Sequence, residues 1–268
     1  MRKRHLQGRR HGWIAYAVAL PLAVVMLVPF LYMVATALTS EPDSLRHSVP
    51  EHFGAALAAL PFGRFLFTSV IFSLAVVAGQ VVTSATAAYA FARLRFPGRD
   101  RVFLIYLCAL MTPAIVLVIP RFLLIDALGW VDSYQGLIST ELVSVTGIFL
   151  LRQFFRTIPR DLEDAARLEG AGEWTIFWRV IVPPSRPALA TLAVLAFADQ
   201  WRSFAWPLVA TRSSGMQPLE VGIANLRGMY GLSWSDQMAT AVAAVIPLTV
   251  FYLVAQKYFI RGIEQTVV

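Results

Sequence analysis

The sequence contains a single cysteine, Cys108, and only four histidines among its 268 residues. One cysteine excludes an intrachain disulfide and a metal site built from several cysteines, so we expect Cys108 to be a small packing residue. Charged residues are also scarce: they make up 15% of the chain, whereas 57% of its residues are hydrophobic. Together with a mean hydropathy of +0.63, this composition predicts a membrane protein.

The sequence also lacks the motif G-x-x-x-x-G-K-[ST], whose backbone cradles the phosphates of ATP. The histidines are badly placed for catalysis, because His5 and His11 precede the first apolar run while His47 and His52 follow it. Neither a Ser-His-acid grouping nor a metal-ligand spacing emerges. We therefore expect a protein that is not an enzyme and that binds no metal or cofactor itself.

The sequence does contain long apolar runs bounded by charged residues. A run of about 20 helical residues is needed to cross the hydrocarbon core of a bilayer. The first run is too long for a cleavable secretory signal, so we expect it to stay in place as a helix. We predict an all-α membrane protein with six transmembrane helices, at Trp13–Leu38, Phe65–Ala92, Val102–Leu124, Gly136–Phe155, Ala188–Ala210 and Ala239–Ile260.

The fourth run is the most polar, because it includes Ser139, Thr140, Glu141 and Ser144. Polar side chains within a span face other helices or a watery cavity. We therefore predict that Glu141 belongs to the transport pathway.

The basic residues indicate the orientation of these runs. The net charge of +7 comes from 23 basic residues, most of which lie at the amino terminus, in the second and fourth connections and at the carboxyl end. This scatter along one face reflects topology and does not form a nucleic-acid patch. By the positive-inside rule that face, including both termini, is predicted to be cytoplasmic.

The longest predicted cytoplasmic segment, residues 156–187, contains the stretch EDAARLEGAG from Glu163 to Gly172. Pro159 and the acidic residues that follow are typical of a first helical turn, and Gly170 and Gly172 of the turn that ends a helix. An apolar stripe follows at helical spacing, made of Trp174, Phe177, Trp178 and Ile181. It must be covered by the chain's own helices, the lipid interface or a partner protein.

This segment resembles the EAA signature of the permease subunits of binding-protein-dependent ATP-binding-cassette (ABC) importers. The matching residues are Asp164-Ala165-Ala166, Gly170-Ala171 and Val182-Pro183, with Asp in place of the usual Glu and Val in place of Leu. The resemblance implies a coupling helix that fits a cleft on an ATPase subunit. It also implies that Glu163 or Asp164 makes an ionic contact there, and that Trp174 and Phe177 belong to the same surface.

Further stretches resemble the maltose-type, carbohydrate branch of that family: Ala87 to Asp100, Met111 to Leu137, MYGLSWSDQMATAV and QKYFIRG. The resemblance implies the type I ABC importer permease fold (MetI-like) in a bacterial cytoplasmic membrane. It further implies a second permease subunit, two copies of an ATPase subunit that bind ATP and Mg, and an extracytoplasmic solute-binding protein.

The stretch DQWRSFAWPL, from Asp199 to Leu208, resembles the aromatic-rich fifth span of the family, but Arg202 and Ser203 replace its two usual polar residues. Arg202 has two interpretations: an ion pair with Asp199, or a contact with an anionic solute in the cavity. Trp201 and Trp206 likewise either stack on sugar rings or pack between helices.

Three functions remain open at this stage. The first is import of a sugar or sugar-like solute, and the second is import of an anionic solute such as a glycerophosphodiester or a phosphorylated sugar. The third is an ion-coupled secondary transporter, for which Glu141 and Asp199 would be the intramembrane carboxylates.

Overall fold

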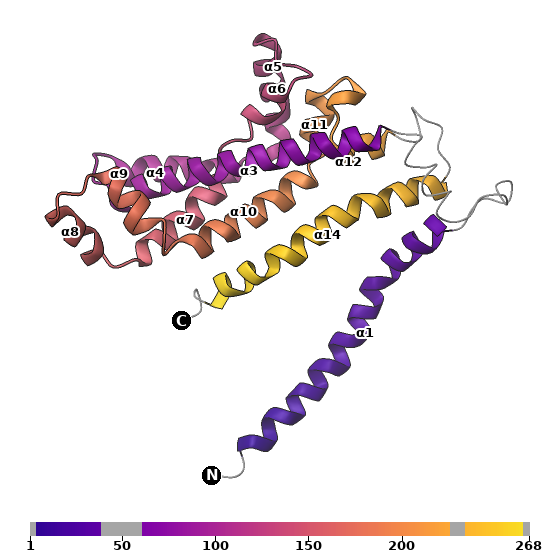
Figure 1. Cartoon of the computed structure of the whole chain (residues 1–268), viewed down its shortest axis with the longest axis horizontal. Helices are drawn as coiled ribbons and strands as arrows, with labels where there is room; N and C mark the ends of the chain where they lie inside the picture. Colours follow the sequence, from indigo (N-terminus) through magenta and orange to yellow (C-terminus); the bar gives the residue numbers. More distant parts are fainter. Residues whose placement is uncertain (1–3, 39–60, 226–233, 265–268) are drawn as a thin grey trace. The chain divides into compact units, whose positions relative to one another are not determined.

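A computed structural model describes residues 4–38, 61–225 and 234–264 of the chain (Figure 1). These residues are helical almost throughout and form no strand within the described ranges, which confirms the all-α prediction. The chain falls into two compact units, one formed by Met1–Leu60 with Asn225–Val245 and the other by Pro61–Ala224 with Ile246–Val268.

The larger unit begins with the long helix α3 and continues through short helices. Its elements are α3 (Phe62–Arg93), α4 (Arg99–Cys108), α5 (Val118–Ala127), α6 (Tyr134–Ser139), α7 (Val145–Thr157), α8 (Asp161–Leu168), α9 (Glu173–Ile176), α10 (Arg186–Trp201), α11 (Ala205–Ala210) and α12 (Leu219–Ala224). Within this unit α8 and α9 lie near one end of α3, and α11 and α12 near the other (Figure 1).

Helix α3 is the centre of the larger unit, because α7 and α10 both pack along it. Small residues allow this approach: a side chain at Gly147 of α7 would lie 2.6 Å from Ser84 of α3 and 2.9 Å from Leu192 of α10. Toward α8 and α9 the core is filled by fully buried side chains, including Leu151, Phe155, Ile176 and Ile181. Burying such apolar surface, at about 25 cal/mol per Å², fixes the ends of these helices relative to one another.

Three of the predicted spans are interrupted. Between α4 and α5 the chain bends by 96° around two short 3₁₀ turns, and Pro113, which has no backbone N–H, lies at the bend. The fourth stretch divides between α6 and α7, where the Ser144 hydroxyl caps α7 by accepting a hydrogen bond from the Gly147 amide at 3.0 Å. The fifth breaks at residues 202–204, between α10 and α11.

The smaller unit contains α1 (Arg4–Leu38) and the first part of α14 (Trp234–Glu264). Ala37 and Ala239 are both fully buried where these helices meet, and Met238 and Val242 pack around them. Most other side chains described in α1 are exposed and apolar, for example Leu27 and Leu31. A surface of this kind suits hydrocarbon and not water.

Three helical segments in the described residues are long and apolar enough to cross a membrane: Ala19–Leu38, Phe62–Arg93 and Trp234–Leu253. The number rises to five if the bent pairs Arg99–Met111 with Ala114–Ala127 and Glu173–Ile181 with Arg186–Trp201 each form one broken span. The second pair includes residues predicted to lie in the cytoplasmic loop. Six spans, and their boundaries in a bilayer, stay a prediction.

Candidate functional site

The stretch that resembles the coupling helix forms α8 and the turn after it. Asp161, Glu163 and Asp164 lie in the first turn of α8, where the helix dipole favours negative charge. The helix ends in a Schellman motif, because the Gly170 amide bonds the Arg167 carbonyl and the Ala171 amide bonds the Ala166 carbonyl, both at 3.0 Å.

Of Gly170 and Gly172, only Gly170 has a backbone conformation that requires glycine. Gly170 has a φ of 84°, in the left-handed region that side chains disfavour. Gly172 has a φ of −75°, so the prediction that both glycines form the turn is corrected to Gly170 alone. Gly172 instead precedes the first turn of α9.

Glu163 points into the protein and is 2% exposed. Its Oε1 lies 3.0 Å from Nη1 of Arg93, the last residue of α3, and the Arg93 side chain is also buried. Nη2 of Arg93 donates hydrogen bonds to the carbonyls of Phe155 and Ile158, where α7 ends. One guanidinium therefore joins the ends of α3 and α7 to α8, and both charges of the pair are compensated inside the protein.

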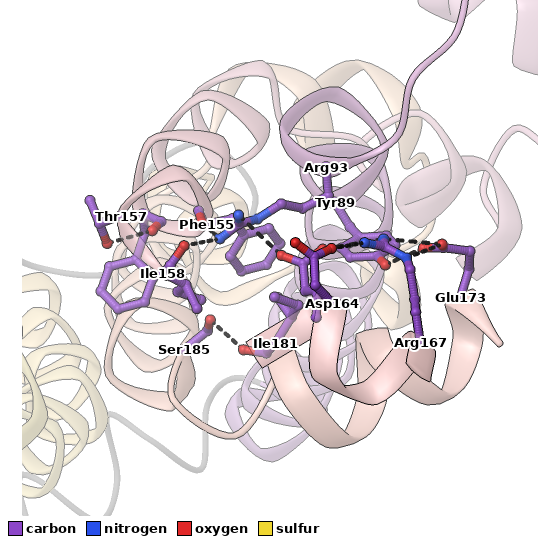
Figure 2. Close-up of polar contacts among 12 residues, drawn as sticks. Tyr89, Arg93, Phe155, Thr157, Ile158, Asp164, Arg167, Glu173, Ile181 and Ser185 are labelled. Carbon is purple, nitrogen blue, oxygen red and sulfur yellow. Dashed lines mark hydrogen bonds and ion pairs between the residues drawn. The ribbon is translucent and has the colours of Figure 1, made fainter. Parts of the chain in front are cut away.

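Arg167 and Tyr89 complete the attachment of α8 and α9 to α3 (Figure 2). Arg167 lies 3.1 Å from both Asp164 and Glu173, and 3.5 Å from Glu163. The Tyr89 hydroxyl of α3 donates a hydrogen bond of 2.6 Å to Glu173 of α9. These contacts hold α8 and α9 against α3 as one unit.

The opposite face of α8 is uncovered. The Asp164 side chain is 66% exposed, Ala165 is exposed, and Ala166 and Ala171 pack in part against the core. Beyond the turn, Trp174 is 68% and Trp178 55% exposed. Acidic, small and aromatic side chains therefore share an open surface.

The predicted stripe of Trp174, Phe177, Trp178 and Ile181 is divided between interior and surface, although the Phe177 ring contacts both tryptophans, at centroid distances of 5.9 Å from Trp174 and 4.9 Å from Trp178. Phe177 and Ile181 are buried, whereas the two tryptophans are exposed. A π-helical turn spans Phe177–Ile181, in which the Val182 amide bonds the Phe177 carbonyl five residues earlier, at 2.9 Å. Such a turn shifts the helical register by one residue.

Arg121 joins two of the residues predicted to belong to the transport pathway, Glu141 and Trp206. Glu141 forms an ion pair with Arg121 of α5, whose guanidinium also donates to the Thr140 hydroxyl at 2.7 Å. The same guanidinium lies 4.1 Å from the ring centroid of Trp206, a cation–π contact. Trp206 is 3% exposed and its indole N–H donates to the Leu137 carbonyl at 3.0 Å. Glu141 and Trp206 thus join α5, α6 and α11.

The remaining pathway residues do not join that cluster. Trp201 is buried and stacks on Phe197, and Asp199 is exposed. Arg202 caps the end of α10, where its Nε donates to the Ala198 carbonyl at 3.0 Å. The described contacts of these side chains include no ion pair with Asp199, so that interpretation of Arg202 is corrected. Ser203 lies in the break after α10, its amide bonded to the Gln200 carbonyl at 3.1 Å.

The acidic group that Arg202 influences is Glu220, at the start of α12. Burial raises the pKa of Glu220, and the charge of Arg202 acts in the opposite direction. The charge of Arg202 therefore acts on α12, while its hydrogen bond lies within its own helix.

Residues 80–265 match the family described as the inner membrane component of binding-protein-dependent transport systems. The chain belongs to this family. It is therefore a membrane permease, as its apolar helices indicate. Among the described residues, no three His, Cys, Asp or Glu side chains gather in a way that could hold a metal ion.

Two kinds of relative resemble the permease over most of its length. The sn-glycerol-3-phosphate transport system permease protein UgpE of Yersinia enterocolitica is 35% identical over 79% of this chain and 76% of the relative. The arabinooligosaccharides transport system permease protein AraQ of Halalkalibacterium halodurans is 30% identical over 90% of this chain and 91% of the relative.

A solved structure shares the fold. It is a chain of a bacterial ABC transporter involved in the import of the acidic polysaccharide alginate, with a TM-score of 0.81 and 24% identity over 97% of this chain and 99% of that one. The likeness confirms the permease fold expected from the sequence.

Sequence analysis missed Arg93 and Arg121. Arg93 ends the second apolar run, and its burial has no local signal because its partner Glu163 lies 70 positions later. Arg121 had a usable signal: it is a charge within the third predicted span, just as Glu141 is within the fourth. Opposite charges in two spans predict an ion pair.

Proposed function

We propose that this chain is the permease subunit of an ATP-driven importer that translocates a sugar or sugar-like solute. The observation that carries the proposal is the two-sided helix α8. Its inner face is fixed to α3 through Glu163 and Arg93, and its outer face leaves Asp164 and Ala165 uncovered. A helix held in this way transmits the movement of whatever binds its outer face to α3.

The proposed complex contains a second permease subunit and two copies of an ATPase subunit that bind ATP and Mg. An extracytoplasmic solute-binding protein delivers the solute. This chain spans the bacterial cytoplasmic membrane with both termini on the cytoplasmic side, where α8 meets the ATPase. Since Glu163 is committed to Arg93, Asp164 is the carboxylate that contacts a basic residue of the ATPase.

The relatives favour two classes of solute. One group is named for arabinooligosaccharides, which supports a sugar as the main proposal. The other is named for sn-glycerol-3-phosphate, which supports an anionic solute as the second. Arg121 is already neutralised by Glu141, so it offers no free charge, whereas the exposed Arg202 does.

Uptake into vesicles tests the proposal. The chain is co-reconstituted with the second permease and the ATPase encoded by neighbouring genes, and the binding protein is added outside. We expect uptake of labelled arabinooligosaccharide that needs both ATP and the binding protein. Uptake of sn-glycerol-3-phosphate alone would select the anionic solute. Uptake driven by an ion gradient without ATP would contradict both.

A further inference from the structure

Two adjoining cavities lie where α3 ends, α4 begins and α7 ends. One measures about 600 Å³ and the other about 910 Å³. Their lining includes seven arginines, namely Arg93, Arg95, Arg99, Arg101, Arg152, Arg156 and Arg160, of which Arg93 is already paired with Glu163. We call the two cavities together the arginine cleft.

The positive charge of the arginine cleft is mostly uncompensated. Asp100 is the only acidic residue in the lining of the two cavities, and it already lies 3.2 Å from Arg99 and 3.3 Å from Arg152. Across the described residues, Arg156 and Arg160 form no ion pair. Arginines gathered in a concave surface without counter-charges raise the local concentration of anions.

Arg152 forms a fixed base for the cleft. Its side chain is nine-tenths buried, its Nε donates to the Phe91 carbonyl at 3.3 Å, and its guanidinium lies 3.9 Å from the Phe103 ring centroid. A guanidinium held by packing loses little conformational entropy when it binds an oxyanion. The Arg152 guanidinium is therefore in place before any ligand arrives.

The cleft continues into an apolar surface. Leu104, which lines the smaller cavity, is 63% exposed, and its neighbours Val102 and Ile105 on α4 are 49% and 72% exposed. A soluble anion or an acidic protein surface gains nothing from contact with these exposed apolar side chains. A phospholipid has both a charged head and apolar chains, which fit the cleft and the side of α4 respectively.

We propose that the arginine cleft binds the phosphate headgroup of an anionic phospholipid from the membrane leaflet on the predicted cytoplasmic side. The phosphate oxygens accept hydrogen bonds from Arg156 and Arg160 above Arg152, and an acyl chain lies along α4. Because Arg160 directly precedes α8, the lipid then steadies the turn that carries α8. The proposal depends on the membrane assignment and not on the solute.

Native mass spectrometry of the purified full-length permease, titrated with phosphatidylglycerol or phosphatidylcholine, tests this site. We expect tighter retention of phosphatidylglycerol. The double variant Arg156→Gln/Arg160→Gln should weaken it by roughly thirtyfold, about fivefold for each arginine near the headgroup. Both side chains are exposed, so the fold should persist, and Arg156→Lys/Arg160→Lys should restore much of the affinity.

The matched control is Arg179→Gln/Arg186→Gln, which removes the same charge from exposed positions on the same predicted face outside the cleft. It should retain lipid as the wild type does. Equal losses in both double variants, or none in the cleft variant, would overturn the proposal. Displacement of the lipid by inorganic phosphate at equal concentration would do so too, because it would identify a soluble phosphate as the ligand.

Discussion

Glu163 and Asp164 are neighbours in sequence with opposite environments. The side chain of Glu163 is 3% exposed and faces Arg93, whereas that of Asp164 is 66% exposed and faces Arg167 at the surface. A surface pair of the second kind contributes little to stability, while breaking a buried pair leaves a charge without compensation. The Glu163 carboxylate therefore stabilises the fold, whereas the Asp164 carboxylate is available to a partner.

Glu163→Gln and Asp164→Asn are a matched pair of variants for these tasks. We expect Glu163→Gln to lower the stability of the permease by about 3 kcal/mol, because Arg93 stays buried without its counter-charge. Asp164→Asn should leave the melting temperature unchanged but weaken ATPase binding. The measurements are thermal unfolding in detergent and co-purification of the ATPase subunit.

The double variant Arg93→Met/Glu163→Met controls for burial, because it removes both charges together. It should recover part of the stability lost in Glu163→Gln. If Asp164→Asn melts earlier than Glu163→Gln, the assignment of the two tasks is reversed.

Helix α8 depends on its ending as well as on its charges. The Schellman motif turns the chain so that Glu173, the first residue of α9, meets Tyr89 of α3, and this turn needs the positive φ of Gly170. The helix itself is only eight residues long, and a helix of that length is not stable in isolation. Its conformation therefore depends on the turn and on the ion pairs around it.

Gly170→Ala should destabilise the turn by about 1–2 kcal/mol through its left-handed backbone. A bulky residue there should also uncouple ATP hydrolysis from transport, because the strain displaces α8. Gly172→Ala is the control, since Gly172 has an ordinary φ and an added methyl group meets open space. Binding-protein-stimulated ATPase activity and solute uptake, measured together, give the coupling ratio; an unchanged ratio in Gly170→Trp would contradict the docking role of α8.

At the scale of the whole molecule, the sequence predicted those features that depend on residues close together in the chain. Composition predicted a membrane protein, and the acidic residues before Gly170 predicted a short helix and its end. The interruptions of the third, fourth and fifth spans were not predicted, since apolar runs do not report where a polar cap such as Ser144 begins a new helix. The contacts of Arg93 and Arg121 depend on distant parts of the chain, which periodicity cannot show.

In the proposed complex ATP is hydrolysed by a separate subunit, which leads to a prediction for the whole chain. Since the sequence lacks a phosphate-binding loop, the purified permease should not hydrolyse ATP above background. Hydrolysis should appear when the ATPase subunit is added and should increase with the binding protein and solute. A phosphate-release assay measures each step, and hydrolysis by the permease alone would contradict the assignment.

The π-helical turn at Phe177–Ile181 contains one surplus residue compared with an α-helical turn. Removing that residue would restore regular winding and rotate everything before it by about 100° relative to α10. Asp164 and Trp174, which both precede the turn, would then present their open surface in another direction relative to α10. The surface offered to a partner is therefore set by chain length at one turn as much as by the side chains themselves.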